Sequence, residues 1–330
     1  MTLTRLPARR VGKLTAGAQG LGCLGMSELY GPAEERESIA TIHRALELGA
    51  TLLDTADVYG HGENESLIGR AVAGRRDHAV VATKFGVLRP GPGVGTGVRG
   101  DAAYVRECCD ASLRRLGVDH IDLFTLTRVD SAVPIEETAG ALSDLVTAGK
   151  IREIGLSEAG PDSIRRAHAV HPVAALQTEW SLWSRDIEDE IVPLCRELGI
   201  TIVAYAPLGR GFLSGRITGT GELDDFRRTA LPRFAPGNLE KNLALAERLL
   251  LLAGEIGVSA AQLALAWLQH RGPDVVPIPG TRYRTHLEEN VDAAFLQLSP
   301  AELSAVEATF PAEDVAGARW NDYSMSFIGR

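Results

Sequence analysis

The stretch IEETAGALSDLVTAGKIREIGL, residues 135–156, contains one complete unit of a pattern that recurs along the chain. Residues 135–148 have apolar positions at helical spacing, and Gly149 stands where a glycine with a left-handed backbone would end the helix. The short apolar run 153–156 follows and has the length of a buried strand. A helix, a glycine and a strand in this order indicate one turn of an α/β fold.

The same order of helix, glycine and strand recurs on both sides of this unit. Residues 36–48, 104–116 and 188–198 have helical patterns, and each is followed by a glycine. Apolar runs of strand length lie at 20–23, 51–53, 79–82, 121–124, 153–156, 174–176, 200–204 and 275–278. Strands that alternate with helices form parallel sheets with right-handed crossovers. Eight such units over this length predict a closed (β/α)8 TIM barrel, with a doubly wound sheet as the main alternative.

The connections indicate how the chain is organised. No linker divides it, so we expect residues 1–330 to form a single domain. Two segments, 89–100 and 209–237, are rich in glycine, proline or charge and are too long for ordinary connections. Because active sites of barrels lie at the C-terminal ends of the strands, we expect both segments to form loops over the active site.

Composition narrows the class of protein. The 330 residues are 45% hydrophobic and 23% charged, which is ordinary for a soluble globular enzyme. The net charge of −9 argues against a nucleic-acid binder, although a local basic pocket can still hold a small anionic cofactor. The absence of an apolar run of about 18 residues and of a secretory signal predicts no membrane association and a cytoplasmic location. The four cysteines show neither metal-ligand nor disulfide spacing, and they are Cys23, Cys108, Cys109 and Cys195.

Small or polar residues end or follow seven of the predicted strands. In a parallel barrel these strand ends meet at one face, so we expect the seven residues to surround one site. In chain order they are Asp54, Lys84, Thr127, Ser157, Gln177, Tyr205 and Gly280.

Three residues near the second and third strands could form a proton donor. A tyrosine hydroxyl has an ordinary pKa of about 10, and a neighbouring ammonium favours the phenolate and lowers that pKa. Lys84 could provide this ammonium to Tyr59, and Asp54 could hold Lys84 in place. Reduction of a carbonyl group requires such a donor.

Short motifs occur in a fixed order along almost the whole chain. They are Gly20-Leu-Gly-Cys-Leu-Gly-Met26, Leu53-Asp-Thr-Ala-Asp-Val-Tyr-Gly60, Ala82-Thr-Lys84, Gly155-Leu-Ser157, Gln177-Thr-Glu179, Ala204-Tyr-Ala-Pro-Leu-Gly209 and Ile278-Pro-Gly-Thr-Arg282 with Glu289-Asn290. In this order they resemble the aldo-keto reductase superfamily. The resemblance implies a (β/α)8 barrel that binds NADPH in extended form and reduces a small organic substrate. The chain has no strand-linked GxGxxG motif, which agrees with a cofactor site that lacks a Rossmann domain.

The resemblance also implies roles for individual residues. Tyr59 would be the general acid, Lys84 would lower its pKa, and Asp54 would pair with Lys84. Ser157 and Gln177 would hold the nicotinamide carboxamide, and Tyr205 would stack on the nicotinamide ring. The remaining cofactor residues would be Gly22, Cys23, Leu24 and Gly280 at the strand ends, Leu208, Gly209 and Gly211 over the pyrophosphate, Thr281 and Arg282 at the 2′-phosphate, and Glu289 and Asn290 at the adenine.

One position departs from the family pattern. Thr127 stands where related chains usually have a histidine that orients the carbonyl group. A threonine hydroxyl is shorter and carries no positive charge, so it donates at most one neutral hydrogen bond. Strand alternation predicts that the neighbouring Arg128 points elsewhere, and His61 is a weak candidate for a replacement donor. Three hypotheses remain open: reduction of carbonyls, reduction of conjugated enones, and an NADPH sensor with weak catalysis.

Overall fold

The computed structural model describes residues 5–89, 97–219, 223 and 225–330. Eight parallel strands form one sheet in the order β12, β11, β10, β9, β8, β5, β4, β3. Each overlaps one of the predicted runs. Their bounds are β3 Leu21–Gly22, β4 Leu52–Asp54, β5 Val80–Phe85, β8 Ile121–Leu126, β9 Ile151–Ser157, β10 Val173–Glu179, β11 Thr201–Tyr205 and β12 Val275–Pro277.

The two edges of this sheet meet, so the barrel is closed. The backbone N–H of Gly20 donates to the Pro277 carbonyl at 2.9 Å, and that of Gly22 donates to the Pro279 carbonyl at 3.2 Å. A parallel bridge joins Gly22 to Gly280. A Cβ atom on Gly20 would lie only 2.7 Å from the Leu52 carbonyl oxygen of β4 and 3.0 Å from the Ile278 side chain, so this close packing favours glycine there. The predicted (β/α)8 barrel is confirmed.

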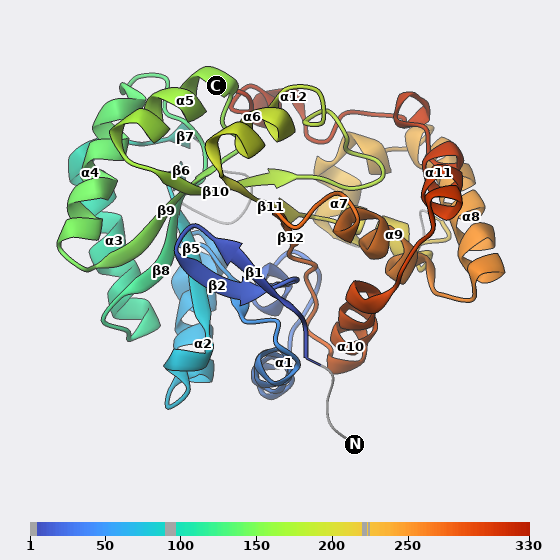
Figure 1. Ribbon diagram of the computed structural model, residues 1–330, viewed down its shortest axis with the longest axis horizontal. Helices are drawn as coiled ribbons and strands as arrows, with labels where there is room; N and C mark the ends of the chain where they lie inside the picture. Colours follow the sequence, from blue (N-terminus) through green and yellow to red (C-terminus); the bar gives the residue numbers. More distant parts are fainter. Residues whose placement is uncertain (1–4, 90–96, 220–222, 224) are drawn as a thin grey trace.

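The helices surround the sheet (Figure 1). They are α1 Glu35–Leu48, α2 Glu63–Val72, α3 Ala102–Leu116, α4 Ile135–Thr147, α5 Pro161–Val170, α6 Ile191–Leu198, α7 Phe226–Ala230, α8 Asn238–Ile256, α9 Ala260–Gln269, α10 Arg284–Asp292, α11 Pro300–Thr309 and α12 Asp322–Met325. The glycines predicted to end α1, α3 and α6 have φ angles of 87°, 63° and 69°, as a left-handed C-cap requires. Helix α6 begins three residues later than predicted, because Pro193 lacks an N–H and is tolerated only in the first turn.

An antiparallel hairpin that the sequence analysis did not predict precedes the barrel. Its strands are β1 Ala8–Val11 and β2 Leu14–Gly17. Val11, Leu14 and Ala16 are buried in one hydrophobic cluster with side chains from inside the barrel, among them Leu52 and Val276. The hairpin therefore covers the end of the barrel opposite the C-terminal ends of the strands. Only three buried apolar side chains mark it, which is too few for a periodic signal.

The two long segments contain more regular structure than predicted. Strand β6 Val87–Leu88 pairs with β7 Gly97–Val98, and residues 90–96 of the predicted loop lie outside the described residues. The second segment includes η4 Gly209–Ser214, α7 and η6 Pro232–Phe234, while residues 220–222 and 224 are not described. The prediction of an irregular loop is wrong for α7. The Asp225 carboxylate accepts from the Arg227 N–H and caps this short helix.

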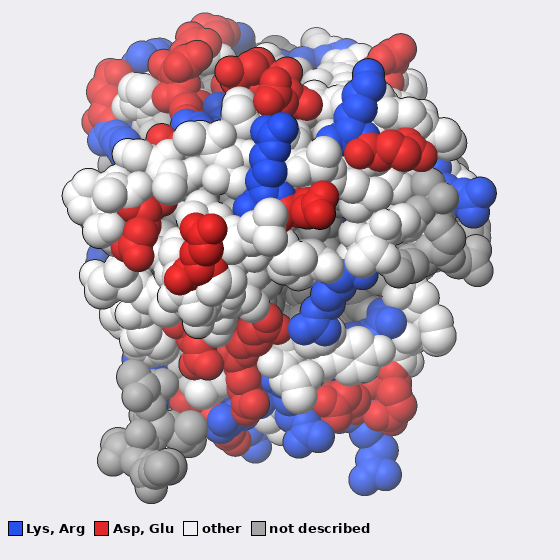
Figure 2. All heavy atoms as spheres, turned by 90° about the vertical axis from the view of Figure 1, so that its right-hand side faces the viewer, with Lys and Arg blue, Asp and Glu red and all other residues white. Residues whose placement is uncertain are grey.

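In the described part of the chain, no single helix is long and apolar enough to cross a membrane. Helices α8 and α9 reach the required length and hydropathy only when joined across an 86° bend. All residues of α9 except Gln262 are buried inside the protein. All four cysteines are reduced and buried. Figure 2 shows acidic and basic side chains interspersed over one face of the molecule, without a patch of one sign.

Candidate active site

A cavity of about 620 Å³ opens at the C-terminal ends of the strands. It brings together all the residues that the sequence analysis selected, except Cys23 and Gly209. The Cys23 side chain is fully buried, with its thiol directed at the Leu21 carbonyl, and Gly209 packs against the Trp183 indole. Those in the lining are Gly22, Leu24, Asp54, Tyr59, Lys84, Thr127, Ser157, Gln177, Tyr205, Leu208, Gly211, Gly280, Thr281, Arg282, Glu289 and Asn290.

A buried ion pair lies at the base of the cavity. Asp54 ends β4 and Lys84 lies near the end of the neighbouring β5, so the two side chains meet above the barrel core. The Lys84 ammonium donates to both carboxylate oxygens of Asp54 at 2.8 Å and to the Thr55 carbonyl at 2.5 Å. Burial alone lowers the pKa of Lys84, but the Asp54 carboxylate and Tyr59 outweigh it and raise that pKa above its ordinary value. Lys84 is therefore charged at neutral pH.

Tyr59 lies directly against this pair. It begins the short helix η2 Tyr59–Gly62, and the Lys84 ammonium is 4.9 Å from the centre of its ring. Burial raises the pKa of Tyr59 above its ordinary value, while Lys84 acts in the opposite direction. The predicted direction of the Lys84 effect is therefore right. The predicted net lowering of the tyrosine pKa is wrong for this structure, because burial disfavours the phenolate more strongly.

The strand ends beside the pair contribute further polar groups. The Gln177 amide donates to the Asp54 carboxylate at 2.7 Å, which links β10 to the Asp54–Lys84 pair. Ser157 ends β9 directly opposite Gln177 in the register of the two strands. Tyr205 ends β11, and burial raises the pKa of its hydroxyl. These three side chains line the same end of the cavity.

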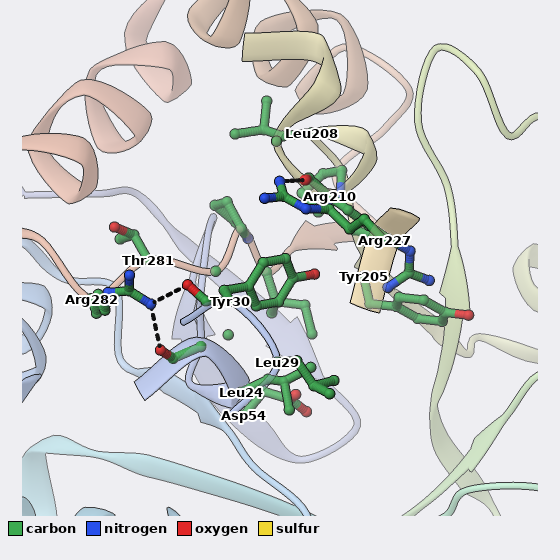
Figure 3. Close-up of a pocket in the computed structure, with 18 of the residues that line it drawn as sticks. Leu24, Leu29, Tyr30, Asp54, Tyr205, Leu208, Arg210, Arg227, Thr281 and Arg282 are labelled. Atoms are coloured by element: carbon green, nitrogen blue, oxygen red, sulfur yellow. Dashed lines mark hydrogen bonds between the residues drawn. The ribbon is translucent and has the colours of Figure 1, made fainter. Parts of the chain in front are cut away.

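Arg282 lies at the other end. Its guanidinium donates to the backbone carbonyls of Gly25 at 3.3 Å, Tyr30 at 2.9 Å and Gly31 at 3.4 Å. Figure 3 shows Arg282 and Thr281 on one side of the pocket, Tyr205 on the opposite side, and Tyr30 between them. Among the residues that the structure describes, no carboxylate pairs with Arg282, and its Nε is buried without a hydrogen-bond partner. No described carboxylate therefore offsets the charge of this guanidinium.

Thr127 and Arg128 follow the end of β8, and both line the cavity. The Thr127 hydroxyl is buried and has no hydrogen-bond partner among the described residues. The prediction that Arg128 points elsewhere is wrong. Strand β8 ends at Leu126, so strand alternation no longer decides where residue 128 points. His61 is exposed and does not line the cavity.

Several lining residues carried no sequence signal. Tyr30 reaches the cavity from a loop, Arg210 from η4, Arg227 from α7 and Trp320 from the C-terminal tail. The Arg210 guanidinium lies 4.2 Å from the centre of the Trp320 ring. Their positions depend on contacts between segments far apart in sequence, which periodicity does not reveal. The one usable indication was the length and composition of segment 209–237, which contains Arg210 and Arg227 and was expected over the active site.

Backbone strain is concentrated around this cavity. Among the described residues, five that are not glycine have positive φ angles. All five lie on segments that border the cavity, and strain of this kind clusters at functional sites. They are Leu29 at 72°, His61 at 54°, Glu158 at 53°, Ala206 at 47° and Arg210 at 60°.

A half-buried carboxyl group lies just before Tyr59. Burial and the nearby Glu65 raise the pKa of Asp57 from 3.8 to about 7. One of its oxygens is buried without a hydrogen-bond partner in the described structure. The folded protein therefore holds this proton between about pH 4 and pH 7. The free energy of unfolding must then fall as the pH rises through that window.

This carboxyl group yields a prediction about stability. The Asp57→Asn variant lacks the titration, so it should be more stable than wild type at pH 8, by about 1 to 2 kcal/mol for a half-buried group. The difference should shrink toward zero near pH 4. Urea denaturation at both pH values measures it, with the exposed Asp162→Asn as a control that should show no such trend. A pH-independent difference for Asp57→Asn would contradict the assignment.

The C-terminal face of the closed barrel holds a buried lysine–aspartate pair against a tyrosine, and an unpaired arginine lies at the far end of the cavity. This arrangement is typical of an enzyme site for a small molecule and an anionic cofactor. A model of the Aldo/keto reductase family matches residues 19–310, so the chain belongs to this family. The predictions of the family and of an oxidoreductase are confirmed. In the described residues, no group of three histidine, cysteine or acidic side chains is placed to hold a metal ion.

Solved structures agree with this assignment. A glycerol dehydrogenase from Gluconobacter oxydans is 31% identical, with a TM-score of 0.83 over 92% of this chain and 96% of that chain. An aldo-keto reductase from Bacillus halodurans in its holo form is 27% identical, with a TM-score of 0.79 over 97% and 99% of the two chains. An aldo/keto reductase from Klebsiella pneumoniae in complex with NADP and acetate is 27% identical, with a TM-score of 0.73 over 96% and 99%.

Proposed function

We propose that this protein is an NADPH-dependent reductase that acts on a carbonyl group of a small organic molecule, with Tyr59 as the proton donor. The observation that carries the proposal is the buried Asp54–Lys84 pair, whose ammonium lies 4.9 Å from the centre of the Tyr59 ring. We further propose that residues 1–330 act as one domain, in the cytoplasm.

The residues at the two ends of the cavity fit the cofactor. A guanidinium matches a phosphate in a bidentate way, and Arg282 has a buried Nε without a partner in the described structure. Arg282 and Thr281 would hold the 2′-phosphate, and Glu289 and Asn290 would hold the adenine. Two structures of aldo/keto reductases from Klebsiella pneumoniae, one in complex with NADP and acetate and one in complex with NADPH, support NADPH as the cofactor.

The rest of the cavity would hold the middle and the reactive end of the cofactor. The backbone of Gly22, Cys23, Leu24 and Gly280 would approach it at the strand ends. Leu208, Gly209 and Gly211 would pass over the pyrophosphate, where both glycines have positive φ angles. Ser157, Gln177 and Tyr205 would hold the nicotinamide. Bound NADPH would supply the hydride.

Side chains of the protein would supply the proton and stabilise the charge that its transfer leaves behind. Because burial raises the pKa of Tyr59, its hydroxyl remains protonated until the substrate oxygen becomes basic. Transfer of this proton to that oxygen leaves a phenolate, which the Lys84 ammonium stabilises in a site of low dielectric. Asp54 keeps Lys84 charged and fixes its position. The pair therefore lowers the cost of the charge that forms on Tyr59.

Turnover separates this proposal from its alternatives. Purified protein is mixed with NADPH and a panel of aldehydes and enones, and the absorbance of NADPH is followed. Oxidation with aldehydes supports carbonyl reduction, whereas oxidation with enones alone supports the second hypothesis. Tight binding of NADPH without any turnover would contradict the enzymatic proposal and favour a sensor.

A substitution at position 127 tests the missing orienting group. Thr127→His should raise the reduction of simple aldehydes by up to ~100-fold, because it restores one strong donor to the developing oxyanion. If the native reaction uses the extra space, activity on the native substrate should fall at the same time. Steady-state kinetics measures both effects.

The isosteric Thr127→Val variant is the control. It removes only a hydroxyl that has no partner among the described residues, so the fold should be unaffected. If neither variant changes activity on any substrate, position 127 does not face the reacting group.

A further inference from the structure

Six arginines line the cavity, and four of them are neutralised within the protein. Arg89 pairs with Glu28 at 2.8 Å, Arg210 with Glu179 at 3.1 Å, Arg216 with Glu289 at 3.0 Å and Arg227 with Asp225 at 2.5 Å. In the part of the chain that the structure describes, no carboxylate lies within ion-pair distance of the other two, Arg128 and Arg282. Buried or half-buried cations without a counter-ion are costly unless a ligand neutralises them.

The two unpaired arginines occupy different ends of the cavity. Arg282 has a ligand in the proposed function, namely the 2′-phosphate. Arg128 lies at the end formed by Thr127 and Ser157, where the proposed function places the uncharged nicotinamide. The cofactor therefore does not account for the charge of Arg128.

Local contacts hold the Arg128 guanidinium in place. One of its terminal nitrogens, Nη1, donates to the Thr127 carbonyl at 2.6 Å and to the Ser157 hydroxyl at 3.3 Å. Because β8 and β9 are neighbours in the sheet, these bonds fix the guanidinium beside the strand ends. In the described structure, Nη1 donates all the hydrogen bonds that the Arg128 side chain forms. A guanidinium has five N–H donors, so Nη2 and Nε remain for a ligand.

Glu158, which lies near Arg128, is hydrogen-bonded to another cation, Arg319. Arg128 is close enough to Glu158 to help lower the pKa of that carboxyl. However, both Glu158 oxygens accept from Arg319 at 3.2 Å, and one also accepts from the Glu179 N–H at 2.9 Å. This arrangement attaches the C-terminal tail to the barrel and leaves Arg128 without a dedicated counter-ion.

We propose that Arg128 is an anion subsite for the substrate, and that the enzyme prefers carbonyl compounds that also carry a carboxylate. One planar guanidinium matches one carboxylate in charge and geometry. The other described cations at this end, Lys84 and Arg210, are paired with Asp54 and Glu179, so the subsite offers one positive charge, which equals the charge of one carboxylate. The proposal rests on the proposed function and names its substrate class.

A matched pair of substrates tests the subsite. In the wild-type enzyme, kcat/KM should be higher for 4-carboxybenzaldehyde than for benzaldehyde. Arg128→Met should lower kcat/KM for the carboxylated aldehyde by roughly 10- to 100-fold, mainly through KM, because it removes charge-assisted hydrogen bonds. Benzaldehyde should change less than about threefold by the same argument.

Two further variants complete the kinetic test. Arg128→Lys retains the positive charge and should recover part of the loss. Arg166→Met removes an exposed arginine that pairs with Glu136 outside the cavity, and it should change neither substrate. Equal losses on both aldehydes would assign Arg128 to positioning Thr127 and Ser157 and would overturn the proposal. No change with either aldehyde would also overturn it.

A binding experiment separates this proposal from the proposed function. Calorimetry measures the affinity of benzoate, benzamide and phenyl phosphate for the protein with and without NADP. Benzoate should bind more tightly than benzamide, and Arg128→Met should abolish the difference even if the protein reduces no aldehyde. Benzoate binding that does not depend on Arg128, or stronger binding of phenyl phosphate, would overturn the carboxylate assignment. If the wild-type protein reduces no aldehyde but binds benzoate through Arg128, the proposed function is wrong and the anion subsite is supported.

Discussion

Tyr59→Phe should lower kcat by roughly 10²- to 10⁴-fold, the usual contribution of a positioned general acid. The variant removes one hydroxyl and retains the ring that packs against the Lys84 ammonium. The dissociation constant of NADPH should therefore change little, and fluorescence titration of the cofactor measures it beside the steady-state rate. A loss of kcat without a loss of binding identifies an interaction made in the transition state.

A second tyrosine provides the control for this experiment. Tyr323 is exposed in the C-terminal helix α12 and does not line the cavity, so Tyr323→Phe should retain full activity. Wild-type turnover by Tyr59→Phe would mean that another group delivers the proton. A large loss of NADPH affinity in the same variant would instead indicate that Tyr59 holds the cofactor.

Arg282→Ala should raise the dissociation constant of NADPH by roughly 100- to 1000-fold, because truncation removes a partly buried partner of a charged phosphate. NADH lacks the 2′-phosphate and should lose far less affinity. The carbonyls of Gly25, Tyr30 and Gly31, which now accept from Arg282, can bind water in its place. Titration with both cofactors gives the change in selectivity directly.

Arg284 is a matched control two residues further along the chain. It is exposed and pairs with Glu37, so Arg284→Ala should leave the ratio of the two affinities unchanged. Equal losses for NADPH and NADH in Arg282→Ala would contradict the assignment of the 2′-phosphate site. The cofactor selectivity would then have to come from another part of the cavity.

The two unpaired arginines explain how one cavity could recognise two anions. The paired ones, such as Arg210 with Glu179, contribute shape and hydrogen bonds but little net charge. Among the described residues, no carboxylate forms an ion pair with Arg282 or Arg128, so the charge of each remains available to a ligand. The net charge of −9 therefore does not prevent the site from attracting a negatively charged cofactor and substrate.

Local sequence patterns were sufficient to predict the barrel and the residues at its strand ends. Apolar runs and helical periodicity located all eight strands, because burial imposes a local pattern on each of them. The sequence also identified Asp54, Lys84, Ser157, Gln177 and Tyr205, since residues at the C-terminal ends of parallel strands must meet at one face. Glycines such as Gly117 marked the helix ends, because few other residues adopt a left-handed backbone.

The charges that remain available in the cavity could not be predicted from these patterns, because they depend on contacts formed in the folded protein. The direction of Arg128 depends on where β8 ends, and its lack of a counter-ion depends on Arg319, which is distant in sequence and already holds Glu158. Burial of Tyr59 outweighs the effect of Lys84 on its pKa, and burial is a property of the assembled fold. These features arise from contacts between distant segments, so neither periodicity nor motif spacing predicts them.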